Sequence, residues 1–232
     1  MEIIGYSERG AMNALFYEMA LKYDEDEMRK FLQLANFNDS ENYTNFKLYL
    51  EFSLSTFGSP DLVITANKDE ERVVFFVEAK VSECHGYRVD TIIKGKDKDT
   101  SNLIYQLKQK QAFFDSRQIF PDKAERFDKI IHTKMGYRKI GNHPIVRSLV
   151  DEIKGCSIAE YIAIVPKMKN VEKLIDEVGI DKLKIVFWEN IYEKFNNYEI
   201  LKATIIFNQS LDPETKSKKV KSQILNNPLP ND

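Results

Sequence analysis

The sequence predicts an α/β protein in which helices flank a central mixed β-sheet, giving three layers. Two apolar runs, residues 62–66 and 73–77, are rich in β-branched and aromatic side chains, and a charged cluster at 67–71 separates them, which is typical of a β-hairpin. Both runs are apolar at every position, so we expect central strands covered on both faces. A strand, helix, strand pattern over residues 158–188 predicts a parallel crossover.

The remaining elements follow from periodicity and caps. Ser7 is a good N-cap for a helix over residues 8–22, whose apolar stripe contains Met12, Leu15, Phe16 and Met19. A second helix is expected at 24–35 and a strand at 46–56, after which Gly58 and Pro60 turn the chain into the hairpin.

Beyond the hairpin we expect a polar loop over 82–99 and a helix from Thr100 or Ser101 to about residue 114. The inner face of that helix is predicted to contain Leu103, Ile104, Leu107, Gln111 and Phe114. Further helices are expected at 122–132, 143–153, 171–178 and 191–207, and strands at 158–165 and 183–188.

Composition suits one globular domain over residues 1–207, with a helical, partly basic insertion at about 117–156 and a polar tail at 208–232. No apolar run approaches the roughly 20 residues of a membrane helix. Two cysteines and the lack of a signal-peptide pattern predict a cytoplasmic protein. Three scattered histidines show no zinc-ligand spacing, and the net charge of −2 is mild evidence against tight non-specific DNA binding.

Three charged residues lie at one end of the predicted hairpin: Asp61 before the first strand, and Glu78 and Lys80 where the second ends. Residues two apart on a strand share a face, so Glu78 and Lys80 should point the same way. If the hairpin is symmetric about Asp69 and Glu70, Asp61 lies opposite Glu78 with Cβ atoms about 5 Å apart. Like charges there destabilise a sheet unless a cation lies between them. Two carboxylates, with positions left for water and a phosphate, therefore predict a magnesium site.

A simpler interpretation is a surface hairpin whose Glu78 and Lys80 form an exposed ion pair of little energetic consequence. Strands that are apolar on both faces favour the magnesium site over this interpretation, because charges at the end of a buried strand need a partner. A register slip of one residue would put Asp61 and Glu78 on opposite faces and remove the basis for the site.

At these residues the chain resembles the PD-(D/E)xK nuclease superfamily, here as Pro60-Asp61 followed by Glu78-Ala79-Lys80. The order of predicted elements is similar to the restriction-endonuclease-like core over about residues 7–188. The resemblance implies that Asp61 and Glu78 bind Mg²⁺, with Mn²⁺ as a substitute. It also implies that Lys80 orients or helps to activate the attacking water.

The resemblance adds two residues. In this superfamily an acidic residue on the first core helix often points at the metal site, and Glu8 matches that place as a further metal ligand. A Glu in a first turn also complements the helix dipole, worth about 0.3–1 kcal/mol, and both interpretations stay open. Several families carry a Gln on the helix after the Glu-x-Lys strand, which Gln106 matches. The variant with Tyr four residues later is absent, because residue 110 is Lys.

A basic segment without acidic residues extends from Ile130 to Val150, and its cationic side chains are Lys134, Arg138, Lys139 and Arg147. Tyr137 lies among them. A local basic segment with an aromatic residue is typical of a nucleic-acid-binding surface. An ordinary solvated surface has the same composition, and the nearby motif is what favours DNA.

We therefore expect a Mg²⁺-dependent nuclease that hydrolyses DNA phosphodiester bonds, with endonuclease as the expected mode. Cleavage of both strands would favour a homodimer. The alternative is a non-catalytic nucleic-acid-binding or assembly module that keeps the nuclease fold. The presence of Asp61, Glu78 and Lys80 together favours the enzyme. DNA against RNA, and the form of the substrate, stay open.

Overall fold

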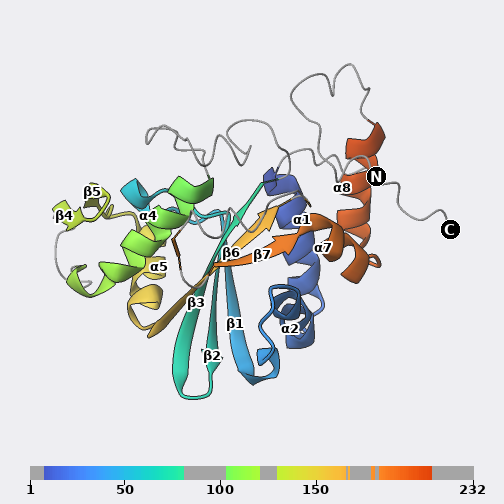
Figure 1. The fold of residues 1–232 in the computed structure, drawn as a ribbon, viewed down its shortest axis with the longest axis horizontal. Helices are drawn as coiled ribbons and strands as arrows, with labels where there is room; N and C mark the ends of the chain where they lie inside the picture. The colour runs from blue at the N-terminus through green and yellow to red at the C-terminus, as the bar shows by residue number, and fades with distance from the viewer. Residues whose placement is uncertain are drawn as a thin grey trace.

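The computed structural model describes residues 8–80, 103–120, 130–165, 167, 179–180 and 183–210, without the side chains of residues 8 and 205–210. A five-stranded sheet runs through the centre, with helices on both faces (Figure 1). Its strands, in spatial order, are β1 (Tyr43–Leu50), β2 (Leu62–Lys68), β3 (Glu71–Ala79), β6 (Ile158–Val165) and β7 (Leu183–Phe187). β1, β2 and β3 pair antiparallel, whereas β3, β6 and β7 are parallel. The predicted α/β class with a mixed, helix-flanked sheet is confirmed.

The β2–β3 hairpin has the predicted register. Lys68 pairs with Glu71 and Leu62 pairs with Val77, so the hairpin is symmetric about Asp69 and Glu70. Asp69 has a φ of 53°, a conformation that Asp tolerates better than most residues. Both apolar runs of the hairpin are buried along their whole length, as expected for strands covered on both faces.

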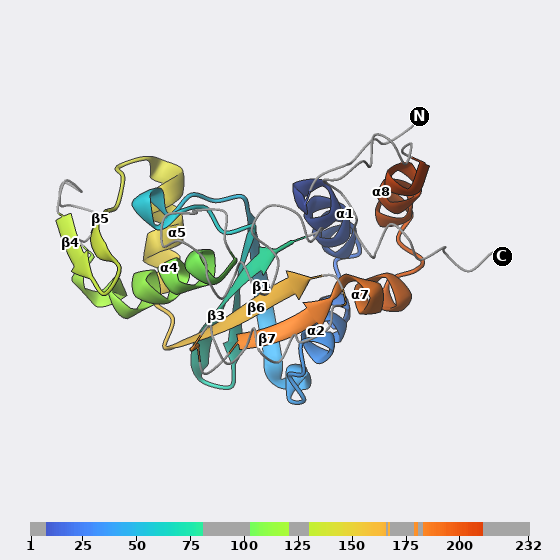
Figure 2. The same ribbon diagram turned by 45° about the horizontal axis from the view of Figure 1, so that its top comes forward.

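Two apolar cores lie on opposite faces of the sheet (Figure 2). One core joins the sheet to α4 (Leu103–Asp115) and α5 (Pro144–Lys154), and alternate β3 residues such as Phe76 point into it. The other core, which receives Phe75, joins the sheet to α1 (Glu8–Leu21), α2 (Glu25–Leu34) and α7 (Trp188–Lys194). The final helix, α8 (Glu199–Ser210), packs against α1. The face toward which each β3 side chain points is thus fixed by strand alternation.

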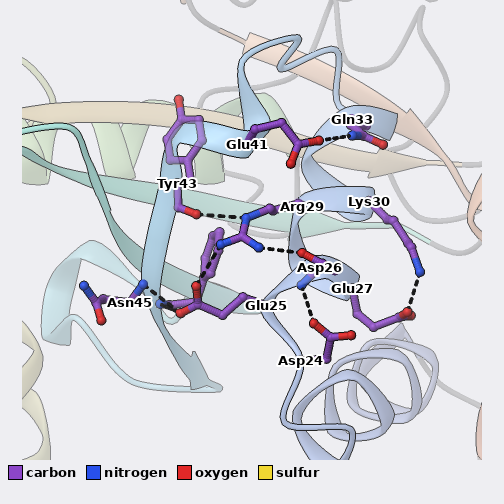
Figure 3. Close-up of polar contacts among 11 residues, drawn as sticks. Asp24, Glu25, Asp26, Glu27, Arg29, Lys30, Gln33, Glu41, Tyr43 and Asn45 are labelled. Atoms are coloured by element: carbon purple, nitrogen blue, oxygen red, sulfur yellow. Dashed lines mark hydrogen bonds and ion pairs between the residues drawn. The ribbon is translucent and has the colours of Figure 1, made fainter.

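Polar contacts attach α2 to β1 (Figure 3). The Asp24 side chain caps α2 by accepting from the Asp26 N–H at 2.9 Å. Glu25 accepts from the backbone N–H of Asn45 at 2.7 Å, where the pairing of β1 with β2 is irregular. Arg29 Nε donates to the Tyr43 carbonyl at 3.2 Å. The carboxylate and guanidinium thus satisfy backbone groups beside the irregular part of the ladder.

The strand predicted at residues 46–56 is partly wrong, since β1 begins three residues earlier and ends at Leu50. Glu51 and Ser55 both have positive φ angles, 58° and 56°, which take the chain out of the extended conformation after Leu50. The chain instead forms a turn containing the short 3₁₀ helix η2 (Ser55–Phe57). Leu54 N–H closes this turn on the Gly58 carbonyl at 2.9 Å.

The helix predicted at 122–132 is also wrong where the structure describes it, because Ile130–Thr133 forms strand β4. It pairs antiparallel with β5 (Gly136–Lys139) in a separate two-stranded sheet. β-branched Ile130, Ile131 and Thr133 favour a strand, and Gly136 supplies a positive φ of 88° at the turn. The expected insertion therefore contains η3 (Arg117–Ile119), a β-hairpin and α5, and is not wholly helical.

The single helix predicted over 191–207 is interrupted. α7 ends at Lys194 and α8 begins at Glu199, and between them Phe195 and Tyr198 are buried. The Tyr198 hydroxyl donates a short hydrogen bond to Glu27 of α2, so a tertiary contact takes the place of helical continuity. The predicted strand at 183–188 ends at Phe187, and the expected strand at 158–165 is confirmed.

Several predicted features lie outside the described residues: the loop at 82–99, the cap at Thr100 or Ser101, the helix at 171–178 and the tail beyond Ser210. None of the helices in the described part of the chain is long and apolar enough to span a membrane.

Candidate functional site

Asp61 and Glu78 lie opposite each other at the end of the central hairpin. The pairing of Leu62 with Val77 continues outward by one residue, which brings Asp61 beside Glu78. Asp61 is two residues before Val63, and Glu78 is two after Phe76, so both point to the face covered by α4. The Ala79 N–H donates to Asp61 Oδ2 at 2.8 Å and holds the carboxylate in place. The predicted convergence on one face is therefore present.

Glu78 is a fully buried carboxylate. Neither of its oxygens has a hydrogen-bond partner among the described residues. Lys110 Nζ lies 3.1 Å from Oε1, close enough for an ion pair although not in hydrogen-bond geometry. Burial raises the pKa of Glu78 to about 7, and the charge of Asp61 adds to the rise, while Lys110 and Lys80 offset it in part. An oxygen-seeking cation would relieve this carboxylate.

Lys80 follows β3 and is held by three backbone contacts. Its N–H donates to the Ile164 carbonyl of β6 at 2.8 Å, which extends the parallel ladder by one residue. Its carbonyl accepts from Trp188 Nε1 at 3.0 Å, and its Nζ donates to the Ala79 carbonyl at 2.8 Å. The side chain is nine-tenths buried, and its charge acts on Glu78. Lys80 therefore lies close enough to Glu78 for its charge to act on that carboxylate, and its predicted role stays a prediction.

Lys110 is a site residue that the sequence did not predict. It belongs to α4, is 1% exposed, and reaches both Glu78 and the Phe57 carbonyl, the latter at 3.2 Å. Its spacing from Leu103, Leu107 and Phe114 already placed it on the inner stripe of the helix, where a lysine needs an anion. Gln111, expected on that stripe, is only half-buried. A lysine on the apolar stripe of a helix is thus the sequence feature that indicates a buried anionic partner.

Gln106 lies on α4 one turn before Lys110 and is half-buried. Its Oε1 is buried without a hydrogen-bond partner among the described residues. Residues one turn apart share a helix face, which places Gln106 beside the charged residues without a direct contact to them. Its predicted role stays a prediction.

The turn at residues 55–58 supports Lys110. Gly58 has φ 82° and ψ 179°, a conformation essentially restricted to glycine. A Cβ at this position would lie 3.1 Å from both Lys110 Nζ and Gln109 Oε1. The backbone conformation therefore requires glycine, and an added Cβ would also crowd the side-chain ends of Gln109 and Lys110.

Glu8 begins α1, as predicted, but its side chain is not described. The neighbouring turn of α1 can be placed, because Arg9 and Asn13 both contact the Glu51 carboxylate. The Glu51 N–H in turn donates to the Asp61 carbonyl at 3.3 Å. The start of α1 therefore lies at the same end of the sheet as Asp61. Whether Glu8 caps the helix or binds a metal stays open.

The predicted basic segment divides into two parts. Lys134 and Lys139 are exposed on the β4–β5 hairpin, next to Tyr137, which is 67% exposed. Arg138 is half-buried and donates to the Tyr105 hydroxyl of α4 at 3.2 Å, so it fastens the hairpin. Arg147 is half-buried on α5. The exposed cations of this segment are therefore its two hairpin lysines.

The β4–β5 hairpin is connected to the turn that supports Lys110. Thr56 Oγ1 donates to the Lys139 carbonyl at 2.9 Å and accepts from its N–H at 2.6 Å. Ser55 Oγ accepts from the Gly141 N–H at 2.6 Å. Because Phe57 follows directly in the same turn, the basic hairpin and the Glu78–Lys110 pair share one support.

The described residues fit a divalent, oxygen-binding ion in part. Asp61 and Glu78 are adjacent carboxylates, and the Glu78 oxygens are buried without hydrogen bonds. Within the described ranges, however, His, Cys, Asp and Glu do not gather in any group of three that could hold a metal. A Mg²⁺ ion at this pair would therefore need oxygen ligands beyond the two carboxylates, as Mg²⁺ sites commonly do.

No family model, curated protein or solved structure matches the chain. The interpretation of the site therefore depends on its own geometry and charges.

The titration of Glu78 should appear in the stability of the protein. A carboxyl whose pKa is raised on folding destabilises the folded state once it ionises, so the loss grows as the pH rises from 4.5 to about 7. Without metal and in a chelator, wild type should lose stability relative to Glu78→Gln over this range, by on the order of 3 kcal/mol. Urea unfolding at pH 5, 6, 7 and 8 measures the difference. A pH-independent difference would show that Glu78 does not titrate in this range.

Gly58→Ala should destabilise the protein by about 2–4 kcal/mol, because backbone strain adds to the close contacts with α4. Gly136→Ala is the matched control, since Gly136 also has positive φ but a methyl group added there would have no heavy atom within 4 Å. The control should lose only about 1–2 kcal/mol from strain. Equal losses in urea unfolding would mean that the approach of α4 to Gly58 is unimportant.

Proposed function

We propose that the protein is a Mg²⁺-dependent nuclease of the PD-(D/E)xK type that hydrolyses DNA phosphodiester bonds, with endonuclease as the expected mode. The proposal includes a restriction-endonuclease-like core for the mixed sheet. The observation that carries it is Glu78, a fully buried carboxylate whose oxygens have no hydrogen-bond partner among the described residues, beside a second carboxylate at the end of the central strands. Burying Glu78 beside the half-buried Asp61 is costly, and a metal site gives a functional reason for that cost.

In this proposal Asp61 and Glu78 bind the ion, and Glu8 is the candidate for a further ligand. An ion held there would polarise the phosphate and lower the pKa of bound water. The Ala79 N–H fixes Asp61, and strand pairing on both sides of β3 fixes Glu78. Ligands on rigid strands keep their geometry without reorganisation, which favours a preorganised site.

Lys80 is proposed to stabilise negative charge as it develops on the phosphate or the attacking water. Its backbone is fixed on both sides, by Ile164 and by Trp188, so its position depends on packing at the end of the sheet. Gln106 is proposed to orient a water or phosphate oxygen from α4, because its buried Oε1 has no hydrogen bond among the described residues.

DNA is proposed to bind along the β4–β5 hairpin, with Lys134 and Lys139 contacting backbone phosphates. Arg138 supports the hairpin from behind, and Arg147 extends the positive charge to α5. The exposed ring of Tyr137 is a surface on which a base or sugar can pack. A homodimer that cleaves both strands is part of the expectation for an endonuclease.

One observation favours the alternative, a non-catalytic nucleic-acid-binding or assembly module. The Glu78–Lys110 ion pair balances the buried charge without a metal. A pair of this kind can persist for structural reasons alone, although buried pairs seldom add net stability. The two functions differ in whether Lys80 affects a chemical step.

The variant Lys80→Ala should distinguish a nuclease from a non-catalytic binding module. The change removes a positive charge without removing a carboxylate, so a nuclease should keep its affinity for DNA and lose cleavage by about 10²–10³-fold. Lys108→Ala removes one charge from a half-buried position on α4 and should cleave at the wild-type rate. Cleavage of linear, circular and branched DNA with Mg²⁺ or Mn²⁺, paired with binding by fluorescence anisotropy, measures both. Unaltered cleavage in Lys80→Ala, or none by wild type on any DNA or RNA, contradicts the proposed function.

The hairpin lysines should determine the salt dependence of DNA binding. Each lost phosphate contact lowers the slope of log affinity against log salt by about 0.9, so Lys134→Ala with Lys139→Ala should lower it by about 1.8. Lys194→Ala is the control, because Lys194 is exposed on α7 at the opposite face of the sheet. An unchanged slope in the double variant would assign the hairpin to ordinary solvated surface.

A further inference from the structure

Four ionisable groups meet at the end of the central hairpin. The charges of Asp61, Lys80 and Lys110 all act on Glu78. Two carboxylates and two ammonium groups cancel, so these described residues carry no net negative charge when ionised. A site that attracts a divalent cation from water usually has a surplus of negative charge. Lys110 removes that surplus.

Lys110 has no route to solvent within its present packing. Its side chain is 1% exposed, its Nζ donates to the Phe57 carbonyl, and Gly58 packs against the same nitrogen. A divalent ion bound by Glu78 therefore has a fixed ammonium group close by. Charges of the same sign repel strongly in a buried site, where screening by water and salt is weak.

The sign of this effect does not depend on the protonation of Glu78. If Glu78 is ionised, the ion must weaken an existing ion pair and also lie beside the ammonium group. If Glu78 is protonated, no ion pair is lost, but a doubly charged ion repels Lys110 more strongly than a singly charged carboxylate attracts it at the same distance. In both cases Lys110 opposes binding of the metal alone.

We propose that Lys110 couples metal binding to binding of an anionic phosphate ester, so that the site fills with both together. The proposal rests on the proposed function. With a divalent ion present, the four groups and the ion have a surplus of positive charge, and the phosphates of a nucleic acid neutralise it. Metal and nucleic acid should therefore tighten each other's binding by the same factor, as linkage requires. The protein alone should bind the metal weakly.

Lys110→Met tests the first half of the proposal, because Met replaces the buried stem and removes the charge. Calorimetric titration of the protein with Mn²⁺ alone, without nucleic acid, should give at least tenfold tighter binding than wild type. Lys108→Met, the control on the same helix, should bind Mn²⁺ within twofold of wild type. Circular dichroism and a cooperative unfolding transition establish that each variant is folded, and Lys110→Gln is a second variant for the same measurement.

Wild type tests the second half without substitution. Binding of a labelled 20-base-pair duplex is measured by anisotropy with and without Ca²⁺, which also takes oxygen ligands. Ca²⁺ should tighten duplex binding at least tenfold, and the duplex should tighten Ca²⁺ binding by the same factor. This direction is informative, because added salt by itself weakens duplex binding. In folded Lys110→Met the coupling factor should fall by at least tenfold.

The outcomes distinguish this proposal from the proposed function. Folded Lys110 variants that bind Mn²⁺ no more tightly than wild type overturn the role of Lys110, whether or not the protein cleaves DNA. If neither variant folds, absence of coupling in wild type overturns it. Tighter Mn²⁺ binding in the variants together with coupling in wild type supports it. If the variants bind Mn²⁺ more tightly and wild type shows coupling, but no nucleic acid is cleaved, the proposed nuclease function is contradicted and the role of Lys110 in coupling is supported.

Discussion

The fully buried carboxylate of Glu78, at the end of the central strand β3, constrains the structure around it. An isolated buried charge costs several kcal/mol, so Glu78 requires a cation beside it. Lys110 supplies that cation from α4, and because it is equally buried it requires the Phe57 carbonyl in turn. One charge and its partners thereby hold β3, α4 and the turn at residues 55–58 in a fixed arrangement. Gly58 allows that arrangement, since a side chain there would meet Lys110.

The same turn connects the charged residues to the basic surface. Thr56 hydrogen-bonds to the backbone of Lys139, the last residue of β5, and Ser55 hydrogen-bonds to the backbone of Gly141, two residues further on. A ligand that shifts the β4–β5 hairpin would therefore act on the turn that positions Lys110.

Structural and functional interpretations of the site differ in what they explain. An ion pair between Glu78 and Lys110 explains the charge of Lys110, and Ala79 holds Asp61 and Lys80 through its backbone groups. These contacts do not explain why two carboxylates and two lysines gather at one place. Apolar residues of similar volume would stabilise the end of the hairpin at least as well. Four ionisable groups gathered at the end of the hairpin, one of them from α4, favour a ligand that carries charge. The proposed divalent ion with a phosphate ester would contact all four.

The sequence by itself determined the hairpin and its charges. Doubly apolar runs identify central strands, and the symmetry of the turn sets the register that brings Asp61 to Glu78, because strand alternation and turn position are local properties. Only the tertiary structure decided that Lys110 faces Glu78, since a helix stripe shows which residues point inward but not what they meet. Tertiary contacts also decided the helix break before Tyr198, because burial of Tyr198 against Glu27 outweighs local helix preference there.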